Sequence, residues 1–279
     1  RQRQMCIRDS TRSWLDNLKF RLSYGTLGNQ YTSSLYPYMA TIEPTTSIMP
    51  IGGSITSAMR QNSASNRYIT WETIKMTNLG LDMGLFNNKL NMSFDYFIKD
   101  TDDILLRVEL PGVLGVTEPY QNAGKVRNKG WELALSWKDK IGKNFTYGVD
   151  FNLSDVKNEV VSMGNTADDF SGDQIRAVGY PIDAFWGFQA DGLYTVDDFD
   201  YDVNTGKYTP KKSTPVIEEL RTKVQPGDIK YRDLDGDGEI TTKDDRTYIG
   251  SAIPRYTYSL GVNAAWKGID LKVFLQGVG

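Results

Sequence analysis

Residues 131–154 read WELALSWKDKIGKNFTYGVDFNLS, and this stretch decides the fold class. Apolar residues alternate with mostly polar ones through 131–138 and again through 144–154. A period of two is that of a β-strand with one apolar and one polar face. Five residues, 139–143, separate the two runs and include Gly142. The stretch therefore predicts two antiparallel strands joined by a tight hairpin.

The same alternation recurs on both sides of this hairpin. Two aromatic residues, Phe97 and Phe274, interrupt it because each takes a position on the polar side of its run. Seven strands are expected in all. The five further runs are 17–24, 78–85, 90–98, 256–266 and 269–276.

Short and long connections alternate strictly between these runs. The short ones are 86–89, 139–143 and 267–268, and the long ones are about 25–77, 99–130 and 155–255. Successive antiparallel strands put successive connections on opposite edges of a sheet, so all the long loops share one edge. This asymmetry predicts an all-β fold, part of an antiparallel transmembrane β-barrel with short periplasmic turns and long extracellular loops.

A soluble β-sandwich explains the alternation equally well but not the loop asymmetry, since long structureless loops are uncommon in compact domains. A barrel also gives a position to the aromatic residues near the strand ends, in the girdles at the two membrane interfaces. The sandwich stays the alternative, as a calcium-stabilised glycan-binding or adhesion module. The aromatic residues concerned are Trp131, Trp137, Tyr256 and Trp266.

Composition removes several classes of protein. The 279 residues contain no His, which excludes His-based catalytic triads and His metal sites, and a single Cys, which excludes an internal disulfide framework. The net charge of -3 gives no reason to expect nucleic acid as a partner. No run of about 18 apolar residues predicts a membrane-spanning helix. No catalytic motif stands out in a fitting context, so an enzyme is not expected.

Several segments occur together in an order typical of one family. The chain resembles the SusC/RagA-type TonB-linked outer-membrane transporters of Bacteroidetes, and the resemblance covers most of residues 15–279. The segments that carry it are LKFRLSYG at 18–25, GN at 28–29, WE at 71–72, TNLGLD at 77–82, NAGKVRNKGWE at 122–132, PGDIKY at 226–231, DDR at 244–246 and IG at 249–250 with Pro254 and Tyr256.

The resemblance implies a 22-stranded barrel in the bacterial outer membrane, closed by an N-terminal plug. It implies import of nutrient oligosaccharides or peptides, energised by the TonB complex and assisted by a SusD-like lipoprotein. Residues 11–279 are then expected to be a partial barrel without the plug domain and the C-terminal strand. Residues 1–10, RQRQMCIRDS, match nothing after them and resemble a translated sequencing adaptor, so they are expected to be a scar.

An acidic segment at 233–244, DLDGDGEITTKD, fits the spacing of a twelve-residue calcium loop. Carboxylates stand at positions 1, 3 and 5, Gly238 stands at the sharp turn, and a main-chain carbonyl is available at position 7. Clustered carboxylates repel one another unless a cation joins them. An empty acidic turn is the alternative. The predicted Ca²⁺ ligands are Asp233, Asp235, Asp237, Glu239, Thr241 and Asp244.

A cluster of aromatic residues at 185–194 is the candidate substrate contact. Phe185, Trp186 and Tyr194 could stack on sugar rings, but packing of the loop itself explains them as well. Charged residues on the polar side of the strands are expected to line a wet lumen and to meet the plug. They are Lys19, Arg21, Asp82, Asp95, Glu132, Asp150 and Asp270.

Overall fold

The computed structural model describes residues 14–31, 36–45, 50–51, 54–55, 58–61, 63–108, 110–164 and 166–279. The segment 1–10, expected to be a scar, lies outside the described residues. The chain divides into two compact units. One comprises 1–167, 177–182 and 253–279, and the other comprises 168–176 and 183–252.

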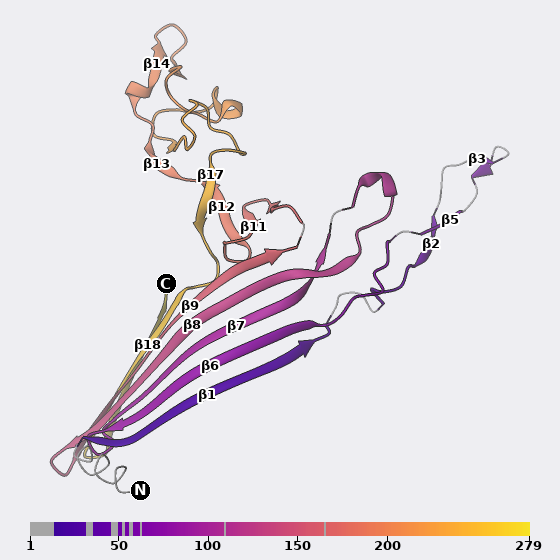
Figure 1. The fold of residues 1–279 in the computed structure, drawn as a ribbon. Coiled ribbons are helices and arrows are strands. Elements are labelled where there is room, and N and C mark those ends of the chain that lie inside the picture. Colours follow the sequence, from indigo (N-terminus) through magenta and orange to yellow (C-terminus); the bar gives the residue numbers. More distant parts are fainter. Residues whose placement is uncertain are drawn as a thin grey trace. The chain divides into compact units, whose positions relative to one another are not determined.

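The first unit is one sheet of seven long antiparallel strands in the order β1-β6-β7-β8-β9-β18-β19, and Figure 1 shows them side by side. Every strand that the alternation predicts is present. The tight connections at 86–89 and 267–268 are confirmed, and 142–144 joins β8 to β9. The bounds are Leu15–Asn29 for β1, Glu72–Leu85 for β6, Leu90–Arg107 for β7, Tyr120–Ile141 for β8, Phe145–Met163 for β9, Tyr256–Trp266 for β18 and Ile269–Val278 for β19.

The strands are longer than the sequence pattern. β7 continues to Arg107 and β8 begins at Tyr120, so the expected long loop at 99–130 is wrong in its bounds. The true connection is 108–119 and contains the short helix η1 (Gly112–Leu114). Residues 99–103, KDTDD, are all polar, as expected where both faces of a sheet meet water, and they therefore carry no alternation to detect.

Cross-strand register sorts the side chains into two faces. One row of directly paired residues is apolar on all seven strands, and the row one residue further along is mostly polar. The apolar row is Leu18, Met83, Met92, Leu135, Phe151, Leu260 and Leu275. The polar row is Lys19, Asp82, Ser93, Ala134, Asn152, Ser259 and Gln276.

The apolar face of this sheet is not packed against a second sheet in the described part of the chain. Phe20 is 76% exposed and Leu275 is 59% exposed. A soluble sandwich buries this face, so the sandwich alternative is wrong and the predicted barrel segment is confirmed. Among the described residues, no helix is long and apolar enough to cross a membrane.

The second unit is built from short elements around a small core of Tyr194, Phe199 and Val216, with Val224 packed against it. Its four-stranded sheet has the order β10-β11-β12-β17, and β13 pairs with β16 and β14 with β15. The bounds are Asp169–Ser171 for β10, Gln174–Arg176 for β11, Ala184–Phe188 for β12, Ala190–Leu193 for β13, Phe199–Asp202 for β14, Lys207–Pro210 for β15, Ile229–Tyr231 for β16 and Arg246–Gly250 for β17. The short helices are η2 (Val196–Asp198) and η3 (Glu218–Leu220).

Two small strand pairs complete the first unit. They lie between β1 and β6 and are β2 (Ile42–Thr45) with β5 (Ala58–Gln61), and β3 (Pro50–Ile51) with β4 (Ser54–Ile55).

Candidate functional site

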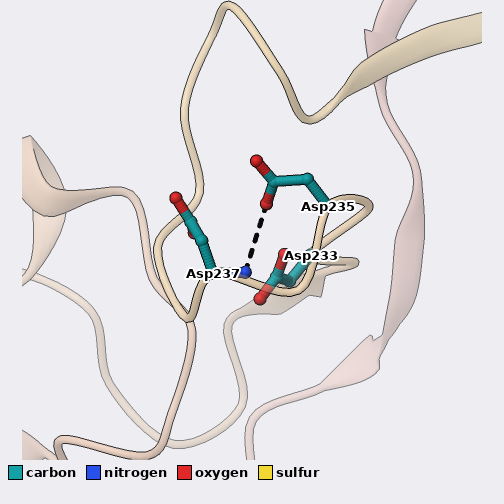
Figure 2. A group of neighbouring side chains, drawn as sticks. All are labelled: Asp233, Asp235 and Asp237. Carbon is teal, nitrogen blue, oxygen red and sulfur yellow. Dashed lines mark hydrogen bonds between the residues drawn. The ribbon is translucent and has the colours of Figure 1, made fainter.

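The acidic segment folds into a loop between β16 and β17. Figure 2 shows three of its aspartates on one turn, with the main-chain amide of Asp237 bonded to the carboxylate of Asp235. Asp233, Asp235 and Asp237 each offer an oxygen atom within 4.8 Å of the others. The main chain holds Asp233 in place, because the amide of Gly236 donates to its Oδ1 at 2.6 Å and the amide of Gly238 to its Oδ2 at 2.8 Å. Gly238 has a φ of 91°, which only glycine adopts without strain.

A buried carboxylate that the sequence analysis did not identify fixes both ends of this loop. Asp245 is 0% exposed and accepts the amide of Leu234 at 2.7 Å and the amide of Thr241 at 2.7 Å. Between these anchors the buried Ile240 donates its amide to the carbonyl of Val216 at 3.2 Å. The acidic loop is therefore attached to the core of its unit.

Two carboxyl groups of the loop have pKa values shifted in opposite directions. The amide of Gly238 holds the pKa of Asp233 below its usual value. The amide of Asp237 also lowers the pKa of Asp235, but desolvation and the charges of Asp237 and Asp245 outweigh it, so this pKa is raised. Like-charge repulsion from Asp237 and Asp245 contributes to this raised pKa after desolvation, and a bound cation would relieve that repulsion.

The other predicted ligands are less well placed to coordinate a cation. Asp244 is not in the group of three, and its amide donates to Oγ1 of Thr241 at 3.1 Å. The Glu239 amide donates to Oδ1 of Asp237 at 2.8 Å, and the Glu239 side chain is exposed, so only its carbonyl is suited to the role expected for it. The donor set fits a hard cation at three carboxylates, and the full set of six ligands stays a prediction.

The aromatic candidates do not form one surface. Tyr194 is 4% exposed, donates its hydroxyl to the carbonyl of Pro215 at 2.7 Å, and packs edge-on against Phe199. Trp186 packs edge-on against Phe170. The burial of Tyr194 favours the packing interpretation for that residue, and a role of Phe185, Trp186 and Tyr194 in substrate binding stays a prediction.

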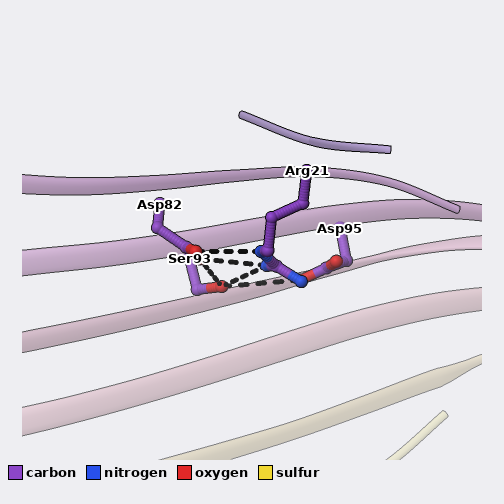
Figure 3. A network of polar contacts seen from close by, with 4 residues as sticks. All are labelled: Arg21, Asp82, Ser93 and Asp95. Atoms are coloured by element: carbon purple, nitrogen blue, oxygen red, sulfur yellow. Dashed lines mark hydrogen bonds and ion pairs between the residues drawn. The ribbon is translucent and has the colours of Figure 1, made fainter. Parts of the chain in front are cut away.

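The polar face of the large sheet carries a charged network, drawn in Figure 3. Arg21 on β1 makes two hydrogen bonds to Asp82 on β6, at 2.8 and 2.9 Å, and a third to Asp95 on β7, at 2.7 Å. Its direct partner on β6 is Gly80, where a Cβ atom would stand 2.7 Å from the guanidinium carbon. The glycine therefore gives the arginine room to reach across one strand to the next.

The other charged residues expected to line the lumen share this face. Lys19 is paired with Asp82, Glu132 with Asp95, Asp150 with Ser136 and Asp270 with Ala265. The Oγ of Ser136 donates to Asp150 at 2.7 Å. The polar face is thus a hydrogen-bonded, water-compatible surface opposite the apolar face.

Comparisons with known proteins agree on the fold. A family model described as "TonB dependent receptor-like, beta-barrel" matches residues 13–278. TonB-dependent receptor P3 of Formosa agariphila is 31% identical over 268 residues, which are 92% of this chain and 25% of that protein. TonB-dependent receptor SusC of Bacteroides thetaiotaomicron is 28% identical over 192 residues, 63% of this chain and 19% of that protein.

Among solved structures, the RagAB peptide importer in the 'open-open' state superimposes with a TM-score of 0.70 at 23% identity. The match covers 95% of this chain and 26% of that one. The chain spans about a quarter of the length of the first of the curated relatives named here.

Proposed function

The chain belongs to the TonB-dependent receptor β-barrel family of the bacterial outer membrane, and from this premise we propose that it forms part of the wall of a nutrient importer. The cargo is an oligosaccharide or a peptide, the TonB complex supplies the energy, and a SusD-like lipoprotein assists. The observation that carries the proposal is the seven-stranded sheet with one apolar face and one face lined by charged and hydrogen-bonded residues.

One structural neighbour supports a peptide as the cargo, since it is described as a peptide transporter. The relative named TonB-dependent receptor SusC supports a receptor of the same family. The polar face supports passage of a hydrated solute, because it presents charged and hydrogen-bonding side chains such as Arg21, Asp82 and Asp95 to water.

Uptake by cells tests this proposal. A strain that carries the intact gene should accumulate a labelled oligosaccharide or oligopeptide, and deletion of the gene or of TonB should abolish accumulation to the same extent. Uptake that continues without TonB would contradict an energised importer. Turnover of the substrate by the purified protein would favour an enzyme instead.

We also propose that the loop 233–244 binds Ca²⁺ through Asp233, Asp235, Asp237 and Asp244, with the Glu239 carbonyl and Thr241 completing the site. Convergence of three carboxylates within 4.8 Å and the raised pKa of Asp235 support this. Extracellular sites of this kind have dissociation constants of about 10⁻⁴ to 10⁻³ M, so occupancy would follow ambient calcium. The bound ion would stiffen an extracellular loop.

Limited proteolysis separates an occupied loop from an empty acidic turn. Four trypsin sites, at Lys230, Arg232, Lys243 and Arg246, lie within or beside the loop. Calcium should slow cleavage there, by about tenfold at ten times the dissociation constant. Asp235→Ala should remove the protection, and Asp191→Ala, an exposed carboxylate of β13, should retain it. Equal cleavage in calcium and in chelator would refute calcium binding.

A further inference from the structure

The apolar face of the large sheet ends abruptly at one row of paired residues. Its last row carries two aromatic residues and one charge, and the next row on the same face carries two lysines. The last apolar row is Leu22, Leu79, Tyr96, Trp131 and Asp155. The row that follows is Tyr24, Thr77, Ile98, Lys129 and Lys157.

The next row on the same face is mostly charged, and most of its charges are neutralised within the sheet. It is Thr26, Lys75, Asp100, Arg127 and Glu159. Arg127 forms an ion pair with Asp100 at 2.7 Å. Asp102 forms ion pairs with Lys75 at 2.8 Å and with Lys125 at 2.9 Å. These groups need no outside partner.

Lys129 and Lys157 are the exception. They stand directly opposite each other on β8 and β9, and both are exposed. Lys157 has one neighbouring anion, Glu159, at 2.8 Å, and Lys129 forms no ion pair with any described residue. Asp155 on the same face is bound to Arg255 at 2.8 Å. The charged groups named here, with this pair included, carry an excess of two positive charges. The cations are Lys75, Lys125, Arg127, Lys129, Lys157 and Arg255, and the acids are Asp100, Asp102, Asp155 and Glu159. Like charges directly opposite on a sheet are destabilising. Glu159, bound to Lys157, balances one of the two lysine charges and leaves the other unmatched, so an anion from outside the chain would be favourable here.

The height of this pair matches the lipid headgroups. The outward apolar residues of β9 run from Phe145 to Leu153, so Val149 lies at their middle. Lys157 is eight residues further, about 27 Å along the strand and about 21 Å along the membrane normal at a tilt of 35–45°. Half of a bilayer with its headgroups is about 20–22 Å thick.

We propose that Lys129 and Lys157 together bind the phosphate of a lipid headgroup in the outer leaflet. Trp131, two residues toward the apolar side, marks the interface at which such a headgroup sits. The inference rests on the membrane location of the sheet and not on the identity of the transported nutrient. A surface of a neighbouring acidic protein is the competing occupant.

Native mass spectrometry of the intact transporter in neutral phosphatidylcholine nanodiscs, titrated with phosphatidic acid, tests the site. The double variant Lys129→Gln/Lys157→Gln should bind phosphatidic acid about thirtyfold more weakly, or about 2 kcal/mol at 1.4 kcal/mol per factor of ten. The control Lys138→Gln/Lys272→Gln removes two exposed lysines of the opposite face and should bind as the parent does.

Three outcomes would overturn the proposal. One is undiminished binding by the double glutamine variant. Another is displacement of the lipid by inorganic phosphate at equal concentration, which would make this a site for free phosphate. The third is loss of binding in Lys129→Arg/Lys157→Arg, which keeps both charges and guards against a folding defect in the glutamine variant. Retention of phosphatidic acid by the arginine variant supports recognition of charge.

Discussion

A charged residue at the middle of the apolar face is the sharpest test of how this sheet lies in the membrane. Val149 on β9 is paired with Trp137 on β8 and with Val262 on β18, so its side chain is flanked by apolar neighbours on both sides. On β9 itself, Phe151 and Leu153 follow it on this face, and Tyr147 and Phe145 precede it. Val149→Arg therefore places a guanidinium close to the bilayer midplane.

The free-energy cost of Val149→Arg follows from the depth of this position in the bilayer. Each end of the apolar run is four residues from Val149, about 14 Å along the strand and about 10 Å along the membrane normal. An arginine at this depth costs about 2–4 kcal/mol, and the value falls to about 0–1 kcal/mol near the interface. A loss of about 3 kcal/mol lowers the equilibrium constant for folding at a given denaturant concentration by more than a hundredfold.

Denaturant titration of the intact parent refolded into lipid vesicles measures this loss as a change in free energy of unfolding. The matched control is Asn152→Arg on the same strand. Asn152 is exposed on the polar face and donates to Oγ of Ser259 at 3.1 Å, so arginine there stays in water and loses one weak hydrogen bond. Equal losses at the two positions would refute the assignment of the apolar face to lipid.

Three other perturbations have definite expected outcomes. Gly80→Ala should displace Arg21 from its partner on β7, since a Cβ there meets the guanidinium carbon at 2.7 Å, and a crystal structure of the variant or lower thermal stability of the intact barrel would reveal it. Asp245→Ala leaves two amides without their acceptor at about 1–3 kcal/mol each, so amide hydrogen exchange in 233–244 should accelerate; unchanged exchange would contradict its anchoring role. The Thr195 amide, and then Lys230, lower the pKa of Asp198, so its stabilising contribution is complete above the unfolded value of about 3.8 and is lost as the pH falls through the lower folded value. Acid titration followed by proteolysis of the second unit should therefore show loosening below that pH, and a loosening that sets in near neutral pH would point to other groups.

The alternation in the sequence was sufficient to predict all seven strands and their faces, because one face is apolar over each strand. It was not sufficient to explain the two aromatic residues on the polar face. Register supplies the reason, since Phe97 is paired with Gly130 and Phe274 with Gly261. Each ring occupies the space that a missing side chain leaves, and the ring of Phe97 comes within 3.1 Å of where a Cβ of Gly130 would be. Pairings between residues this far apart in sequence are not visible in a local pattern.

For the acidic loop, too, the sequence predicted one feature and missed another. Spacing alone predicted that Asp233, Asp235 and Asp237 converge, and their oxygen atoms do. The burial of Asp245 was not predictable, because it stands beside Asp244 with no local feature to distinguish the two. Tertiary contacts distinguish the two residues. The amides of Leu234 and Thr241 both donate to the Asp245 carboxylate, whereas Asp244 is exposed.

The depth of Val149 and the depth of Lys157 both depend on the vertical position of the sheet in the membrane, so a measurement of one constrains the other. Asp155, Lys157 and Glu159 of β9 occupy the face that is apolar below Asp155, and such a sequence is stable only where water reaches that face. If Val149 lies at the midplane, Lys157 lies about 21 Å above it, at the level of phosphates. A vertical shift of the sheet by one row would lower the cost at Val149 and move Lys129 and Lys157 away from the headgroups at the same time. A large cost at Val149 with no lipid phosphate at the lysines would thus leave the membrane position intact and assign the lysine pair to a protein neighbour.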